Sequence, residues 1–166
     1  MNTCSGPVCA AAVILPEHLE IPGLNDSKKL TDKKRRELFP IIKEQAIAYG
    51  IGFASEHEID EINILEATKK AMREAAAQVP ADIFLVDAVT GLGLKGQEVP
   101  IVKGDATSYA IAAASIVAKV TRDRMCYEMD EKYPMYGFAK HKGYGTKLHM
   151  EMLDRFGPCD AHRKTF

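Results

Sequence analysis

Two aspartates each follow a short apolar segment at a point where chemistry could take place. Asp87 comes directly after the apolar run 83–86, and Asp105 follows the segment 99–102 at the start of a long helical pattern. Because open α/β sheets place ligands at the carboxyl ends of their strands, both carboxylates are expected at one sheet edge. Such oxygen ligands suit Mg²⁺ or Mn²⁺, and paired ions of this kind hydrolyse phosphodiesters. The sequence therefore predicts Asp87 and Asp105 as metal-binding catalytic residues.

Each aspartate also has a purely structural interpretation. Asp105 is predicted to cap a helix that runs from about residue 106 to residue 132, because a carboxylate accepts hydrogen bonds from unpaired helix N–H groups. Asp87 could serve as a turn residue. The small residues 112–115 in the first turns of the predicted helix indicate that something approaches its backbone closely.

Positive charge is gathered in three segments, 28–36, 140–147 and 162–164, although the net charge is −1. Separated basic patches on a near-neutral protein favour a local contact with a polyanion. The first segment is equally typical of a solvated helix face, whereas the other two favour binding. Tyr144 lies between Gly143 and Gly145, which lack the bulk to bury it, and is predicted to be a recognition residue.

The elements that must position these residues follow from periodicity and capping signals. Strands are predicted at 8–15, 49–54, 83–86 and 99–102, the first of them buried. Helices are predicted at 32–47, after a capping box at 55–58, at 64–79, from about 106 to 132, and between Thr146 and Gly157. This order predicts one mixed α/β domain.

Composition limits the class of protein. A chain of 166 residues with 46% hydrophobic and 27% charged residues is ordinary for one soluble domain. The four cysteines have neither Cys-x-x-Cys spacing nor a Cys/His cluster, which disfavours a zinc site or disulfide framework and favours reduced thiols in a cytoplasm. No apolar run approaches the ~20 residues of a membrane span, and the start lacks a signal-peptide pattern.

Six blocks, in order, resemble bacterial ribonuclease HII. They are 23–30 (GLNDSKKL), 85–87 (LVD), 102–105 (VKGD), 112–123 (AAASIVAKVTRD), 136–146 (YGFAKHKGYGT) and 162–166 (HRKTF), and the similarity runs from about Ser5 to the last residue. The resemblance implies a ribonuclease H-like mixed sheet flanked by helices. It also implies cleavage of RNA in RNA/DNA hybrids, and nicking of DNA 5′ of an embedded ribonucleotide, with Mg²⁺ or Mn²⁺ held by four carboxylates.

The resemblance implies a role for each matching residue. Asp87 and Asp105 match the third and fourth metal carboxylates, and Tyr144 matches a tyrosine that packs on the deoxyribose beyond the ribonucleotide. Phosphate contacts are expected for other residues in these blocks, supported by two short polar side chains; together these are Lys28, Lys29, Lys142 and Arg163, with Asn25 and Ser27.

The family also begins with a strand that carries Asp-Glu-Ala-Gly-Arg-Gly, which supplies two further metal ligands and contacts to the ribonucleotide. Residues 1–5 do not contain this motif. The first, central strand is therefore expected to be missing between the strands at 8–15 and 83–86, with unpaired edges and impaired activity as consequences.

Three functions stay open: a ribonuclease HII-type endonuclease, a catalytically inactive hybrid-binding module, and a Mg²⁺-dependent phosphohydrolase of small molecules. The basic segments argue against the third. The expected partner is an RNA/DNA hybrid or duplex DNA containing ribonucleotides. The protein is expected to be a monomer that does not associate with a membrane.

Overall fold

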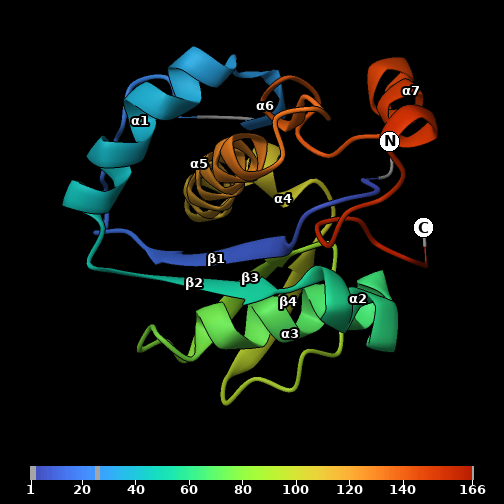
Figure 1. The fold of residues 1–166 in the computed structure, drawn as a ribbon. Helices are drawn as coiled ribbons and strands as arrows, with labels where there is room; N and C mark the ends of the chain where they lie inside the picture. The colour runs from blue at the N-terminus through green and yellow to red at the C-terminus, as the bar shows by residue number, and fades with distance from the viewer. Residues whose placement is uncertain (1–2, 25–26, 166) are drawn as a thin grey trace.

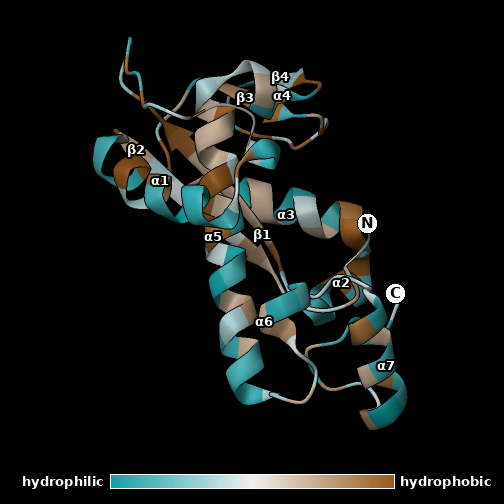
Figure 2. Ribbon diagram, turned by 90° about the horizontal axis from the view of Figure 1, so that it is seen from above, coloured by the Kyte–Doolittle hydropathy of each residue, from teal (hydrophilic) through white to brown (hydrophobic). Residues whose placement is uncertain are grey.

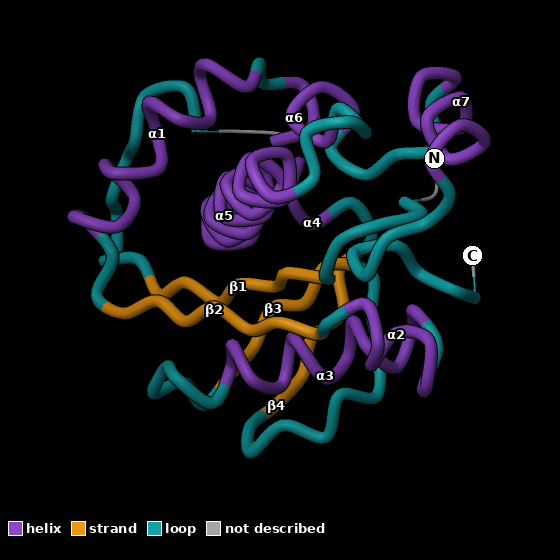
Figure 3. Tube along the Cα trace, in the orientation of Figure 1, coloured by secondary structure: helices purple, strands orange, loops and turns teal. Residues whose placement is uncertain are grey.

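The computed structural model describes residues 3–24 and 27–165, which form two small β-sheets surrounded by helices (Figures 1 and 3). Strands β1 (Val8–Ile14) and β2 (Ala48–Ala54) pair antiparallel, with Val8 opposite Ala54. Strands β3 (Ile83–Asp87) and β4 (Gln97–Ile101) pair parallel. The chain is thus a mixed α/β protein, as predicted.

Helices cover both faces of the β1–β2 pair. They are α1 (Asp32–Gln45), α2 (Glu56–Ile62), α3 (Ile64–Ala76), α4 (Gly104–Thr107), α5 (Tyr109–Lys132), α6 (Phe138–His141) and α7 (Lys147–Phe156), with a 3₁₀ turn, η1 (Ser27–Lys29). Helix α5 packs on one face of the pair and α3 on the other. Seen from above, α5 runs from the β3–β4 end of the molecule to the end that carries α6 (Figure 2).

Two glycines let α3 lie directly on β2. A Cβ atom on Gly52 would come within 2.0 Å of the Ala71 carbonyl oxygen, and one on Gly50 within 2.3 Å of the Ala75 carbonyl oxygen. Since Cβ atoms do not approach oxygens this closely, the helix could not pack here against larger residues. The glycine and alanine pattern therefore fixes the distance between helix and sheet.

The main core lies between α1, α5 and the outer face of β1. Its buried side chains include Leu38 and Ile42 of α1 and Ala113, Ile116 and Val117 of α5. The predicted small-residue run thus lets α1 approach α5 closely. A second cluster around Tyr136, Phe138 and Ala161 joins the end of α5 to the C-terminal segment.

Local capping signals are confirmed. Ser55 and Glu58 form the reciprocal capping box, and the hydroxyls of Thr31 and Thr146 cap α1 and α7. Within the described part of the chain, no helix is long and apolar enough to cross a membrane.

Two expectations about local structure are wrong. Asp105 does not cap the long helix, because Ser108 adopts an extended conformation, separates α4 from α5, and caps α5 by accepting the Ile111 N–H. The first strand is not fully buried either: of its residues only Ala10 is buried, because this strand borders a large cavity.

Candidate active site

A hydrogen bond brings the two aspartates into one region. Asp87 is the last residue of β3, and its Oδ1 accepts the Gly104 N–H at 3.0 Å. Asp105, the next residue in α4, is 3% exposed. A Cβ on Gly104 would lie 2.6 Å from Ile111 Cδ1, so a larger residue here would displace the Ile111 side chain. The end of β3, at Asp87, is therefore joined to the start of α4, which carries Asp105.

These residues fit a divalent metal ion in type but form only part of a ligand set. Carboxylate oxygens are the donors that Mg²⁺ and Mn²⁺ prefer, and Asp87 keeps an oxygen that is not used by Gly104. Residues 3–24 and 27–165 contain no group of three or more His, Cys, Asp or Glu side chains placed to hold a metal. Asp87 and Asp105 would be two ligands of a site that needs more.

The turn η1 packs on α4, the helix that carries Asp105. This turn contacts both α4 and α5, and Lys28 and Lys29 are exposed on it. Asn25 lies outside the described residues, and of Ser27 only the backbone is described. The region therefore joins a carboxylate site to positive charge, an arrangement that suits a phosphate-bearing ligand.

Tyr144 is half-buried, and its ring lies near a lysine from the middle of α5. Lys119 Nζ is 5.8 Å from the Tyr144 ring centroid and 3.1 Å from Asp123 Oδ1. The structure thus keeps part of this ring accessible and places a lysine next to it, which the sequence did not single out. The i, i+4 spacing of Lys119 and Asp123 could have predicted the ion pair between them on one face of the helix.

Lys142 is mostly buried, because its ammonium group packs on protein. Its Nζ donates to the Ala139 carbonyl at 2.7 Å and lies 3.6 Å from the Tyr127 ring centroid. A hydrogen bond from Arg35, followed by the positive charges of Arg35, Lys119 and Lys142, lowers the pKa of Asp32. The first two basic segments are thus electrostatically coupled, and the Lys142 phosphate contact stays a prediction.

Arg163 is engaged inside the protein. Its guanidinium donates to the Gly6 carbonyl at 3.0 and 2.9 Å and to the Thr3 carbonyl at 2.9 Å, and the residue is 9% exposed. These bonds join the C-terminal segment to residues 3–6. Contact of Arg163 with phosphate also stays a prediction, and the structure gives this side chain a structural role beside it.

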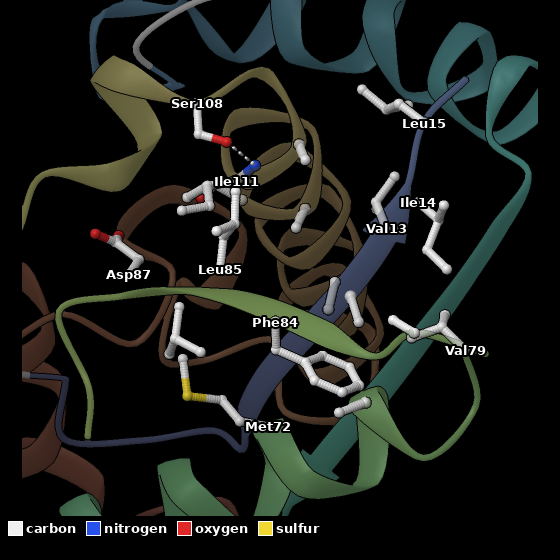
Figure 4. Close-up of a pocket in the computed structure, with 18 of the residues that line it drawn as sticks. Val13, Ile14, Leu15, Met72, Val79, Phe84, Leu85, Asp87, Ser108 and Ile111 are labelled. Carbon is white, nitrogen blue, oxygen red and sulfur yellow. Dashed lines mark hydrogen bonds between the residues drawn. The ribbon is translucent and has the colours of Figure 1, made fainter. Parts of the chain in front are cut away.

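A cavity of about 1050 Å³ opens between the two sheets, with Asp87 at one end (Figure 4). The cavity is lined by residues 9–14 of β1, by Leu15 just after it, and by all of β3. Helix α5 contributes small side chains, at Ala110, Ala114 and Ala118. Among the described strands, β1 pairs with β2 alone and β3 with β4 alone. The cavity therefore runs along two strands that each have an edge outside any ladder.

The structure buries His141, His149 and His162 together, although the sequence pointed to His162 only as part of a basic segment and did not point to His149. The rings of His141 and His149 stack with centroids 4.0 Å apart, and the Nε2 atoms of His149 and His162 are 2.9 Å apart. The Nε2 atom of His141 lies 2.9 Å from the Tyr136 carbonyl oxygen, so this ring is held by structural hydrogen bonding.

Comparison with known proteins identifies the family. The family model for ribonuclease HII matches residues 3–166. Ribonuclease HII of Ruminiclostridium cellulolyticum is 56% identical over 164 residues, and that of Geobacter metallireducens is 53% identical; each alignment covers 98% of this chain. It covers 64% of the first relative and 77% of the second, so the chain spans less than two thirds of the Ruminiclostridium protein.

Solved structures give the same result for the fold. The crystal structure of the ribonuclease H2 from Pyrococcus horikoshii OT3 superposes with a TM-score of 0.82 at 27% identity, covering 99% of this chain and 88% of that one. The Archaeoglobus fulgidus RNase HII of a PCNA:RNase HII complex also has a TM-score of 0.82, at 26% identity, covering 99% and 89%. The fold is therefore ribonuclease H-like, and the chain belongs to the ribonuclease HII family.

Proposed function

We propose that this chain contributes the greater part of an endoribonuclease that cleaves RNA in RNA/DNA hybrids and nicks duplex DNA 5′ of embedded ribonucleotides. The observation that carries the proposal is the family match over residues 3–166, supported by the hydrogen bond that links Asp87 at the end of β3 to the start of α4, which carries Asp105. A small-molecule phosphohydrolase would need the two aspartates but not the neighbouring basic groups. The lysines of η1 and the Tyr144–Lys119 pair favour a polynucleotide.

Asp87 and Asp105 would hold Mg²⁺ or Mn²⁺ with further carboxylates. When bound, such ions lower the pKa of a water molecule and stabilise the leaving oxygen of the phosphodiester. The protein's own contribution is orientation: the Gly104 N–H donates to one Asp87 oxygen at 3.0 Å and leaves the other oxygen for a metal ion. Lys28 and Lys29 would position the backbone phosphates, with Asn25 and Ser27 supporting them.

Tyr144 would recognise the sugar at the RNA–DNA junction. The 2′-hydroxyl is the group that distinguishes the two sugars, so a junction is read through sugar shape and contacts with that hydroxyl. A half-exposed aromatic ring beside Lys119 offers a flat surface for the deoxyribose and a positive charge for the adjoining phosphate. Lys142 and Arg163 would reach phosphate only after giving up their present partners.

We further propose that a strand outside residues 1–166 fills the cavity between β1 and β3. Adjacent strands in a sheet lie ~4.7–4.9 Å apart, and one inserted strand would pair with both free edges and join the two sheets into one. Small residues on α5 face the cavity and would leave room for its side chains. If that strand ended in Asp-Glu beside Asp87, it would supply the two further metal ligands.

The polypeptide is proposed to form a single domain that works as a monomer in the cytoplasm. A duplex-binding measurement tests the central proposal. The affinity of the chain for a labelled DNA duplex with one ribonucleotide is compared, in Mn²⁺, with its affinity for the all-DNA duplex and for a mononucleotide. Tighter binding or 5′ nicking of the ribonucleotide duplex supports the proposal. Equal affinity for the two duplexes, or preference for the mononucleotide, contradicts it.

A further inference from the structure

Two of the three buried histidines, His141 and His149, contact the backbone of the loop that carries Tyr144, and His162 contacts His149. His141 Nδ1 accepts the Gly143 N–H at 3.2 Å, and His149 Nδ1 lies 2.9 Å from the Tyr144 carbonyl oxygen. The backbone here is strained at Lys142, a non-glycine residue with a φ of 52°, and continues through Gly143 with a φ of 83°. A Cβ on Gly143 would also lie 2.6 Å from the Ser5 carbonyl oxygen. This conformation persists only if neighbouring groups hold it.

The hydrogen bonds assign one protonation state to all three rings. A backbone carbonyl only accepts and a backbone N–H only donates, so His141 carries its proton on Nε2 and His149 on Nδ1. His162 Nδ1 accepts the Cys159 N–H at 2.9 Å, which leaves the proton of His162 on Nε2. That N–H then donates to His149 Nε2 at 2.9 Å. Every ring nitrogen is satisfied when the three imidazoles are neutral.

An added proton would break a bond at each ring. Protonated Nδ1 of His141 would face the Gly143 N–H, protonated Nδ1 of His162 would face the Cys159 N–H, and protonated Nε2 of His149 would face another N–H. Two stacked cations 4.0 Å apart would also repel each other. Burial lowers the pKa of all three histidines below the ordinary value of about 6.5.

The other titratable groups around the cluster do not supply a strong compensating charge. They are the Cys4 and Cys159 thiols, the Tyr136 phenol, the Asp130 carboxylate on α5, and Arg163 near Cys4. Burial raises the pKa of both thiols and of the phenol, so these stay neutral. The Asp130 charge raises the pKa of His141, but burial outweighs it.

We propose that His141 and His149, supported by His162, are positioning residues that hold the Tyr144 loop in its binding conformation only while their imidazoles are neutral. The proposal rests on the proposed function in taking Tyr144 as a nucleic-acid contact. The expected effect of acid on duplex affinity is opposite to that of simple charge attraction. Protonating histidines adds positive charge, which by itself tightens binding to a polyanion. Here acidification should instead weaken duplex binding, because the loop loses its support.

Substitution of His149 tests the positioning role. His149→Leu removes the donor to the Tyr144 carbonyl, whereas His149→Asn places an amide at the Nδ1 position and keeps it. We expect His149→Leu to speed amide exchange at Tyr144 by about 2- to 12-fold, the range for one net hydrogen bond, and to weaken duplex binding at pH 7.5. His149→Asn should restore both, and the exposed His57→Asn should change neither. If His149→Leu does not fold, His141→Leu and His141→Asn give the same comparison through Gly143.

Titration of the unmodified chain gives an independent result. Nitrogen-15 shifts of the imidazoles at pH 7 should show Nε2–H for His141 and His162 and Nδ1–H for His149. The affinity for the single-ribonucleotide duplex should hold at neutral pH and fall only below the ordinary histidine pKa of about 6.5, because burial lowers the pKa of all three rings. A charged His149 at pH 7, tighter binding on acidification, or unchanged exchange and affinity in His149→Leu would overturn the proposal. Neutral rings and a loosened loop without any duplex binding would support the positioning role and contradict the proposed function instead.

Discussion

The Asp87 carboxylate accepts the Gly104 N–H and is proposed to bind a metal ion, and one substitution distinguishes these two roles. Asp87→Asn keeps an oxygen that can accept the Gly104 N–H but removes the negative charge. We expect the melting temperature to stay nearly unchanged while Mn²⁺ affinity falls at least ~10-fold, the lower end of the 10–100-fold cost of losing even an outer-shell partner. Manganese electron paramagnetic resonance measures the affinity.

Asp82→Asn is the matched control, because this carboxylate is exposed just before β3 and away from its carboxyl end. Equal Mn²⁺ affinity of Asp87→Asn and Asp82→Asn would show that Asp87 is not a metal ligand. A large fall in melting temperature would show that its charge mainly stabilises the fold.

Removal of the Tyr144 side chain should affect binding without affecting stability. The backbone bonds of this residue to His149 and His141 are unaffected in Tyr144→Ala, and aromatic stacking is worth ~1–3 kcal/mol in single-strand binders. We therefore expect roughly 5- to 150-fold weaker binding to a single-ribonucleotide duplex, measured by fluorescence anisotropy. Tyr49→Ala, at an exposed site on β2, is the control. A fall of many degrees in melting temperature with unchanged affinity would make Tyr144 a packing residue.

At the scale of elements, the contact between α3 and β2 depends on the two glycines of the strand. Gly52→Ala would place a Cβ 2.0 Å from the Ala71 carbonyl oxygen, which belongs to the helix backbone and cannot move alone. Overpacking of this kind costs ~1–3 kcal/mol, or roughly 2–12 °C in melting temperature for a chain of this size. Calorimetry measures the shift. Ile47→Ala, at an exposed residue beside the same strand, should change stability by less than ~0.5 kcal/mol, and an equal fall in both variants would contradict the close-packing argument.

Elements set by local chemistry were predictable, and those set by distant contacts were not. The caps at Thr31, Ser55 and Thr146 follow from side chains bonding backbone two or three residues away. The end of α4 at Ser108 does not, since a single helix through residues 104–132 was also compatible with the pattern. The bond from Gly104 to Asp87, 17 residues earlier in the chain, helps to place α4 separately.

The same distinction applies to the candidate site. Asp87 and Asp105 could be located because strand ends and helix starts are visible in sequence. The burial of Arg163 could not be, because its acceptors Gly6 and Thr3 lie 157 and 160 residues away. The histidine cluster likewise depends on how the loop 142–146, α7 and the C-terminal segment come together.

At the scale of the whole molecule, the cavity between β1 and β3 marks the place of the strand that the proposed enzyme needs in addition to these 166 residues. Strand β3 exposes apolar side chains, with Ile83 59% and Leu85 45% exposed, and most residues of β1 are only partly buried. Unpaired strand edges with apolar faces promote association between molecules. The chain alone should therefore have a low soluble yield and show little nicking, because two carboxylates provide half of the ligands that the resemblance implies.

Adding the proposed strand should raise both solubility and activity, and a variant of the strand without its acidic residues should raise solubility alone. An N-terminal extension with an apolar strand ending in Asp-Glu-Ala-Gly-Arg-Gly should raise soluble yield and melting temperature by filling the cavity. It should also give Mn²⁺-dependent nicking of a single-ribonucleotide duplex by adding metal ligands. The same extension ending in Asn-Gln-Ala-Gly-Arg-Gly should raise stability equally but leave nicking near background, since it keeps the strand and removes the charges. Strong nicking by residues 1–166 alone, abolished by Asp87→Asn, would show instead that other groups of this chain complete the site.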